Sequence, residues 1–129
     1  FPAGDAAHLC RLVLMRMLPA LADHDTASFG AAVSEVQARI GDHFAPAQGG
    51  GRYTSRRVGD AVEALIRAGA AGGGQSSWGP TGFALFASQA AAQAAIAGLA
   101  PNDRSRDGLN FVVARGRNRG AAIEVEAGA

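Results

Sequence analysis

The sequence lacks or nearly lacks several residue types on which common chemistries depend. It contains no lysine, so its 12 basic residues are all arginine, and neither a Schiff-base lysine nor a phosphate-loop lysine is available. The single cysteine, Cys10, excludes a disulfide within the chain, and a reducing cytoplasm is therefore the expected compartment. The apolar neighbours of Cys10 predict that this thiol is buried and inert.

Aromatic residues, excess charge and long apolar runs are also scarce. Aromatic residues make up 6% of the chain and the formal net charge is +1, which argues against nucleic acid or a membrane surface as a partner. The apolar run over residues 9–21 contains Arg11 and Arg16, and it is too short to span a bilayer. With 48% hydrophobic residues, the 129 residues predict a single soluble domain, residues 1–129.

Helix signals dominate the first half of the chain. We predict a well-buried helix from Asp5, its capping residue, to Ala22. A second helix is predicted to begin after a cap at Asp25 and to end at Gly41. A third is predicted to begin after Thr54 or Ser55 and to end at Gly69. The apolar faces of the second and third helices comprise Phe29, Val33, Val36 and Ile40, and Val58, Val62, Leu65 and Ile66.

Strands are predicted only in the second half. The segment 81–88 (TGFALFAS) is typical of a buried strand, and an alanine-rich helix over 88–100 follows it. Residues 109–115 and 121–127 are predicted to form two further strands. The order of elements predicts an α+β fold, with helices packed on one face of a small, mostly antiparallel sheet.

The strongest candidate site is the segment GGGQSSWG, residues 72–79, which we predict to be a loop. Glycines allow backbone N–H groups to converge on an oxyanion, and Gln75, Ser76 and Ser77 add polar side chains. Trp78, the only tryptophan, could form the wall of a pocket for an aromatic ring. The alternative interpretation is a plain connection between a helix and a strand.

A second candidate is the segment GGGRYTSRR, residues 49–57. Arg52, Arg56 and Arg57 lie near the expected start of a helix, where arginines and helix N–H groups can bind phosphate. The alternative is a solvated surface loop in which Asp60 pairs with Arg56. The three histidines are scattered, and the aspartates of the DHD segment at 23–25 are better explained as capping residues, so no metal site is predicted.

The segment GQSSWGPTGFALF, residues 74–86, adds a family resemblance. It resembles the C-terminal glycine-rich motif of the GHMP kinase superfamily. More narrowly, it is similar to the GQSSWGP signature of the beta-ribofuranosylaminobenzene 5′-phosphate synthase family. The preceding helices and the GRNRGAAIEV ending are similar to that family too, so the resemblance covers most of the chain. It implies a ferredoxin-like two-layer sandwich of the GHMP C-terminal type.

The resemblance also implies a reaction. An aromatic acid, 4-aminobenzoate or a relative, would condense with 5-phosphoribosyl 1-pyrophosphate in tetrahydromethanopterin biosynthesis, releasing carbon dioxide and pyrophosphate. It implies phosphate or pyrophosphate contacts at Gly73, Gly74, Gln75, Ser76, Ser77 and Gly79, with Trp78 at the ring and Arg52, Arg56 and Arg57 as further contacts. No cofactor is expected in this domain, although Mg²⁺ could serve the full-length enzyme.

The family's N-terminal phosphate loop has no counterpart in these residues. We therefore expect a C-terminal domain that is inactive alone and needs the missing N-terminal half of the same protein. Two alternatives stay open: the C-terminal domain of an ATP-dependent GHMP small-molecule kinase, and a non-catalytic domain of the same fold. For the latter, the alanine-rich helix and the sheet could supply a homodimer interface.

Overall fold

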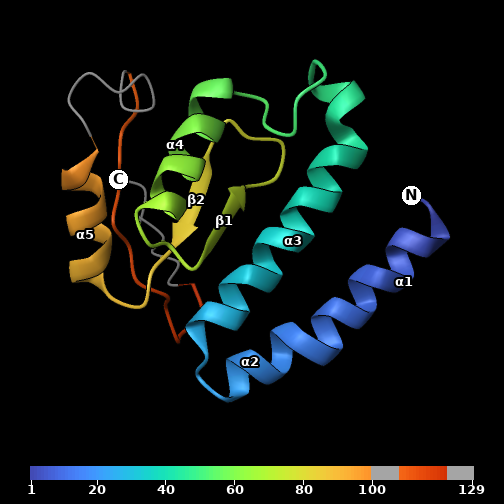
Figure 1. Ribbon diagram of the computed structural model, residues 1–129, viewed down its shortest axis with the longest axis horizontal. Helices are drawn as coiled ribbons and strands as arrows, with labels where there is room; N and C mark the ends of the chain where they lie inside the picture. The colour runs from blue at the N-terminus through green and yellow to red at the C-terminus, as the bar shows by residue number, and fades with distance from the viewer. Residues whose placement is uncertain (100–107, 122–129) are drawn as a thin grey trace, which may run out of the picture.

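The structure is a computed structural model that describes residues 1–99 and 108–121. Helices come first along the chain and are followed by a β-hairpin and a last helix. Figure 1 shows α4 in front of β2, with β1 between these two elements and α3. The elements are α1 (Ala3–Leu12), the π-helical turn η1 (Val13–Met17), α2 (Leu18–Ala22), α3 (Thr26–Phe44), the 3-10 turn η2 (Ala45–Gln48), α4 (Arg56–Arg67), β1 (Gly72–Gln75), β2 (Gly82–Leu85) and α5 (Gln89–Gly98).

The first predicted helix is present, but its start differs from the prediction. Helical structure runs from α1 through η1 to α2 without a break, and we call this run the N-terminal arm (Figure 1). Pro2, not Asp5, occupies the N-cap position. Asp5 lies inside the first turn, and its Oδ1 accepts a hydrogen bond from Arg39 Nη1 of α3 at 3.1 Å. The predicted cap at Asp5 is therefore wrong, because this carboxylate joins two helices instead.

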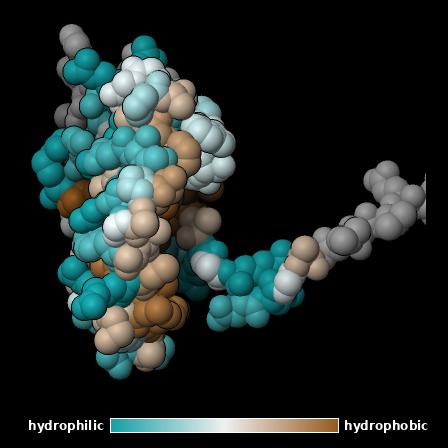
Figure 2. All heavy atoms as spheres, turned by 90° about the vertical axis from the view of Figure 1, so that its right-hand side faces the viewer, coloured by the Kyte–Doolittle hydropathy of each residue, from teal (hydrophilic) through white to brown (hydrophobic). Residues whose placement is uncertain are grey.

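The prediction that this arm is well buried is also wrong. Leu12 and Ala20 are buried, whereas Leu14, Met15, Leu18 and Leu21 expose 48–73% of their surface. Cys10 is exposed too, so the predicted burial of its thiol fails. Figure 2 faces this side of the molecule and shows brown, hydrophobic surface along it. The arm packs against α3, and these four apolar side chains remain exposed within the described structure.

The second helix begins as predicted and ends later. The side chain of Asp25 caps α3 by accepting a hydrogen bond from Ser28 N at 2.9 Å. Gly41, the predicted end, lies inside the helix and is buried. A Cβ at Gly41 would lie 2.5 Å from Arg52 Cγ. This glycine therefore makes room for a side chain from the next segment and does not terminate the helix.

The third helix follows the prediction closely. Ser55 Oγ accepts a hydrogen bond from Val58 N at the start of α4, and Gly69 has a φ of 102° just beyond its end. Val58, Val62 and Leu65 are buried as expected. Ile66 is 38% exposed, so its predicted place in the core is wrong.

The glycine run differs most from its prediction. Gly72–Gln75, expected as a loop, forms the fully buried strand β1, which pairs antiparallel with β2 from Gly72↔Leu85 to Gln75↔Gly82. A Cβ at Gly72 would collide with the carbonyl group of Gly30, so two glycines let α3 and β1 touch backbone to backbone. The N–H of Gly73 donates to Ser34 Oγ of α3 at 2.9 Å. The helix thus satisfies the outer edge of this strand.

The hairpin is the whole sheet within the described residues. The predicted strand at 109–115 has no strand pairing, and nearly all of the one predicted at 121–127 lies outside the described residues. The alanine-rich helix is present as α5, capped by Ser88, and a core cluster of Ala64, Leu65, Ala95 and Leu99 joins it to α4. The α+β class with helices packed on a small antiparallel sheet is confirmed. In the parts described, no helix has the length and apolar character needed to cross a membrane.

Candidate functional site

A cavity of about 230 Å³ lies beside the turn that joins β1 to β2. Its walls come from the second half of α3, from η2, from the segment that leads into α4, and from the β1–β2 turn. Apolar and aromatic walls are contributed by Ile40, Phe44, Tyr53 and Trp78, and side-chain amides by Gln37, Gln48 and Gln75. The remaining lining residues are Gly41, Arg52, Gly74 and Ser77.

The aromatic wall is built from residues far apart in sequence. The rings of Phe44 and Trp78 meet edge to face, with centroids 5.2 Å apart and planes at 65°. Trp78 is 58% exposed and Phe44 is 38% exposed, so this wall is open to solvent on one side. Burial raises the pKa of Tyr53 above its ordinary value of 10.0, so the phenol of this wall is uncharged. The cavity therefore has the flat, largely apolar surfaces that suit an aromatic ring.

The turn after β1 has a compact backbone. Ser76 N donates to Thr81 O at 2.8 Å and Gly79 N donates to Ser76 O at 2.9 Å. Ser77 has a φ of 52°, a left-handed conformation that costs a non-glycine residue about 1 kcal/mol. Among the described residues, neither the hydroxyls of Ser76 and Ser77 nor the N–H groups of Ser77 and Trp78 have a hydrogen-bond partner. These four groups are free to bind an anion or water.

Gly73 and Gly74 lie deeper than the predicted loop would place them. The N–H of Gly73 is already bonded to Ser34, and Gly74 pairs with Phe83. A Cβ at Gly74 would lie 2.6 Å from Gln37 Oε1, so this glycine allows the Gln37 side chain to cross the strand. Contact of either glycine with a phosphate stays a prediction. What the structure adds is their role in close packing beneath the site.

Gln75 ties the turn to the segment that precedes α4. Its side chain, 8% exposed, accepts from Thr54 N at 2.7 Å and donates to Gln48 Oε1 at 2.9 Å and to Ser77 O at 3.2 Å. Thr54 Oγ1 completes the link by donating to Trp78 O at 2.7 Å. The two glycine-rich segments singled out in the sequence are thus adjacent and hydrogen-bonded to each other. The polar atoms of the Gln75 amide are used within the protein.

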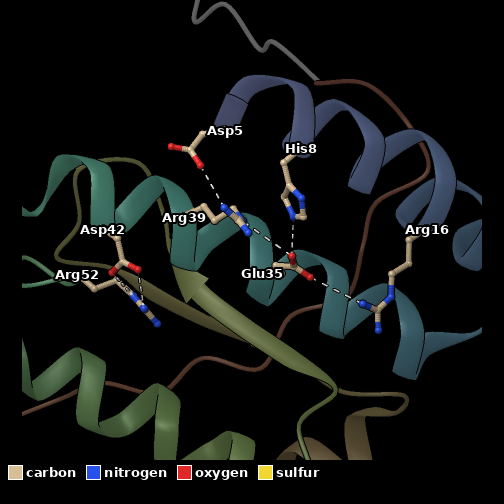
Figure 3. Close-up of polar contacts among 7 residues, drawn as sticks. All are labelled: Asp5, His8, Arg16, Glu35, Arg39, Asp42 and Arg52. Carbon is tan, nitrogen blue, oxygen red and sulfur yellow. Dashed lines mark hydrogen bonds and ion pairs between the residues drawn. The ribbon is translucent and has the colours of Figure 1, made fainter. Parts of the chain in front are cut away.

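The three candidate arginines do not converge on this cavity. Arg52 lines it, but its guanidinium donates two hydrogen bonds of 2.8 Å to the carboxylate of Asp42 (Figure 3). This pairing lowers the pKa of Asp42. Arg56 borders an adjoining polar hollow of about 750 Å³, which shares Gln48, Arg52 and Tyr53 with the cavity, and Arg57 Nη1 lies close to Gly108. Within the described residues neither Arg56 nor Arg57 has an ion-pair partner, so the predicted Arg56–Asp60 pairing is absent.

Sequence reasoning missed the contribution of α3 to the site. Gln37, Ile40 and Phe44 line the cavity, as does Gln48 of η2. One signal was available: Gln37 is a polar residue between Val36 and Ile40 on a face otherwise predicted to be apolar. In the part of the chain that the structure covers, no group of three histidine, cysteine, aspartate or glutamate side chains is placed to hold a metal ion.

Comparison with known proteins places this site in a family. The family model described as GHMP kinases C terminal matches residues 17–102, two thirds of the chain. The chain belongs to the GHMP kinase C-terminal family. The match includes α3, α4, both strands and every residue that lines the cavity. The GHMP kinase resemblance of the glycine-rich motif is therefore confirmed.

A curated relative in this family is also similar over nearly the whole chain. It is named beta-ribofuranosylphenol 5′-phosphate synthase, from Methanothermobacter thermautotrophicus, and is 30% identical over 126 residues. The match covers 93% of this chain but 33% of the relative, so the chain spans about a third of that protein's length. No solved structure matches the chain.

Proposed function

We propose that this chain is the C-terminal part of a synthase that joins an aromatic acid to 5-phosphoribosyl 1-pyrophosphate in tetrahydromethanopterin biosynthesis. The observation that carries the proposal is the cavity walled by Phe44, Tyr53 and Trp78 beside a turn with free hydroxyl and N–H groups. The synthase relative supports the same class of enzyme.

The size and polarity of the cavity suit the aromatic substrate. An apolar cavity of about 150 Å³ accommodates benzene, so about 230 Å³ has room for one substituted ring. The exposed edges of Phe44 and Trp78 would be covered by the ligand or by the rest of the protein.

The proposed reaction needs no external oxidant or reductant. The ring carbon that carries the carboxylate forms a bond to C1 of the ribose, and pyrophosphate leaves with the electron pair of the C–O bond. The carboxylate then leaves as carbon dioxide, and the electrons of its bond to the ring restore aromaticity. The site must therefore hold an aromatic ring and a phosphorylated sugar next to each other, and it must exclude water, which would hydrolyse the sugar pyrophosphate.

The turn supplies the proposed phosphate contacts. The hydroxyls of Ser76 and Ser77 and the N–H groups of Ser77 and Trp78 lie next to the aromatic wall and are unpartnered in the described structure. Gly79 shapes this turn through its left-handed φ of 71°. Arg52 would reach the cavity with a charge that Asp42 partly neutralises, and Arg56 and Arg57 would act only on a ligand that extends beyond it.

Magnesium and the partner domain are part of the proposal for the full-length enzyme. The described residues do not fit a magnesium site, because the carboxylate of Asp42 is bonded to Arg52 and no three candidate ligands cluster. We therefore derive no step through a metal ion. The other wall of the active site would come from the part of the protein that corresponds to the rest of the relative's length.

The test is a product assay with the full-length protein. Incubation with 5-phosphoribosyl 1-pyrophosphate and 4-aminobenzoate or 4-hydroxybenzoate should release carbon dioxide and pyrophosphate in equal amounts. The Trp78→Ala variant should lower kcat/KM by at least about tenfold because it removes the ring wall. The matched Trp78→Phe variant keeps an aromatic face and should retain most of the activity.

Two results would contradict the proposal. If the protein consumes ATP with a small alcohol and releases no pyrophosphate from the sugar, it is a GHMP kinase. If it turns over neither set of substrates, a non-catalytic role of the domain takes precedence.

A further inference from the structure

We propose that Gln37 and Gln48 select the aromatic substrate by donating hydrogen bonds from their amide nitrogens to one of its oxygen atoms. This inference rests on the proposed function for the identity of the ligand. Its physical basis is independent of that function, since it comes from how the amides are oriented. The two side chains would bind an oxygen acceptor, either the carboxylate or a ring hydroxyl, and in the second case they would disfavour an amino group in its place.

The orientation of Gln37 is set by a backbone group that can only donate. The N–H of Gln75 lies 3.1 Å from the side-chain oxygen Oε1 of Gln37. Turning the amide over would place its nitrogen against this N–H, with two donors facing each other. Oε1 is therefore held by β1, and Nε2 of Gln37 is the atom left for a ligand.

The orientation of Gln48 follows from the same reasoning in two steps. Thr54 N donates to Gln75 Oε1 at 2.7 Å, which makes Nε2 the donating atom of the Gln75 amide. That Nε2 lies 2.9 Å from Gln48 Oε1, so Gln48 must present its oxygen to Gln75. Nε2 of Gln48 is again the atom left over. Two backbone N–H groups thus determine the orientation of all three amides.

The two remaining amide nitrogens are unused hydrogen-bond donors on residues that line the cavity. Neither Gln37 Nε2 nor Gln48 Nε2 has a hydrogen-bond partner in the described part of the chain, and both half-buried residues line the cavity. The side-chain oxygens of all three glutamines already accept hydrogen bonds. A ligand that contributes an acceptor here satisfies donors that would otherwise lose their bonds to water, and a donor left unsatisfied when the cavity is filled weakens binding.

Among aromatic acids, this pattern favours oxygen substituents. A carboxylate or a hydroxyl offers lone pairs to an amide N–H, whereas an arylamine offers mainly N–H donors. Sites that hydrogen-bond a particular polar group discriminate strongly against analogues that lack it, because their own buried groups are then left unpaired. If the ring hydroxyl is the group that accepts these hydrogen bonds, we therefore expect 4-hydroxybenzoate to bind more tightly than 4-aminobenzoate.

The experiment uses Gln37→Glu and Gln48→Glu in the full-length protein. Each substitution keeps an oxygen where Oε1 accepts its bond and replaces the Nε2 donor by a second carboxylate oxygen of almost the same size. Calorimetric titration with 4-hydroxybenzoate should give a Kd at least about tenfold higher for either variant. The Kd of 5-phosphoribosyl 1-pyrophosphate should change less than twofold, a separation that a general loss of structure would not produce.

The matched control is Gln93→Glu, which introduces the same charge at an exposed position of α5 outside the cavity. It should leave both dissociation constants unchanged. Urea unfolding of each variant checks that the fold survives. If Gln37→Glu does not fold, Gln48→Glu alone carries the test.

Parallel titrations with 4-aminobenzoate and benzoate identify the oxygen. If the variants lose the same affinity for all three acids, the amides bind the carboxylate. If they lose affinity for 4-hydroxybenzoate alone, the amides bind the hydroxyl. Either result supports the proposal. Unchanged affinity in the glutamate variants, or no binding of any aromatic acid, overturns it. Tight binding without release of pyrophosphate would instead refute the proposed reaction and leave the assignment of the two glutamines intact.

Discussion

The N-terminal arm and strand β1 both pack against α3, but different forces hold them there. Besides the buried Leu12 and Ala20, the arm presents charged side chains to α3: His8 Nε2 lies 2.7 Å from Glu35 Oε1, Arg16 lies 3.8 Å from Glu35, and Asp5 pairs with Arg39 (Figure 3). All of these charged side chains are 36–50% exposed, so each pair contributes at most about 1 kcal/mol.

Strand β1 is held by close packing and buried hydrogen bonds. Its four residues are fully buried, and α3 reaches its edge through glycine contacts and through Ser34 and Gln37. The comparison shows that apolar composition does not by itself bury a helix. A run of glycines, likewise, does not have to form an exposed loop. Whether a segment is buried depends on whether a neighbouring element can approach it closely. Substitutions can test each half of this statement.

The largest expected effect is at the glycine contact. Gly72→Ala would place a Cβ on the carbonyl group of Gly30 and 2.8 Å from Ser34 Oγ, so α3 and β1 would have to separate. We expect the free energy of unfolding to fall by about 3 kcal/mol or more, measured by urea denaturation. The control Gly4→Ala, in α1 with nothing within 4 Å of the added Cβ, should be neutral or slightly stabilising. Equal effects of the two substitutions would refute the close-contact explanation.

A pair of substitutions on the arm gives the next largest effect. Leu12 is 7% exposed and Met15 is 73% exposed. Leu12→Ala should lower the free energy of unfolding by about 2–3 kcal/mol, because it removes a buried side chain and leaves a cavity. Met15→Ala should change the free energy of unfolding of the 129-residue chain by less than about 0.5 kcal/mol. A large loss for Met15→Ala in the full-length protein would mean that another part of that protein covers this face.

The smallest effect concerns the Asp42–Arg52 pair beside the cavity. Its hydrogen bonds lower the pKa of Asp42 below 3.8, so the stability they contribute is present above that value and is lost as the pH falls through the lowered pKa. Asp42→Asn should therefore flatten the dependence of stability on pH below about pH 4. The change should stay under about 1 kcal/mol because Asp42 is 59% exposed. Urea denaturation at several pH values measures it, with Asp60→Asn as the control; an unchanged acid limb would contradict the pairing.

Local signals predicted much of the fold. The caps at Asp25 and Ser55 and the glycine stop at Gly69 are single-residue features with a local physical cause, and all are present as predicted. The cap at Ser88 has the same kind of cause but was not predicted. The strand at Gly72–Gln75 was missed because three glycines carry no alternation of polar and apolar side chains. It is a strand because it pairs with β2, and its other edge is hydrogen-bonded by Ser34 and Gln37, which lie more than 30 residues earlier in the chain.

The candidate site was predictable only in part, for the same reason. Composition and the family motif pointed to Trp78 and the serines that precede it. The partners that define the cavity, Phe44 and Gln48, are brought there by the end of α3 and by η2, and the sequence around them has no distinctive pattern. The inward use of Gln75 could not be anticipated either, because its bonding partners belong to a different segment.

Helix α3, about 28 Å long by its 19 residues, lies between these two regions. Glu35 and Arg39 face the arm, Ser34 and Gln37 face β1, and Phe44 faces the cavity. From Ser28 to Arg39 no residue is fully exposed. A helix that packs against a neighbour on each side has almost no position at which a side chain can be substituted without loss of contacts. In a saturation mutagenesis screen of the full-length protein, α3 should therefore be the segment of this chain with the fewest tolerated substitutions.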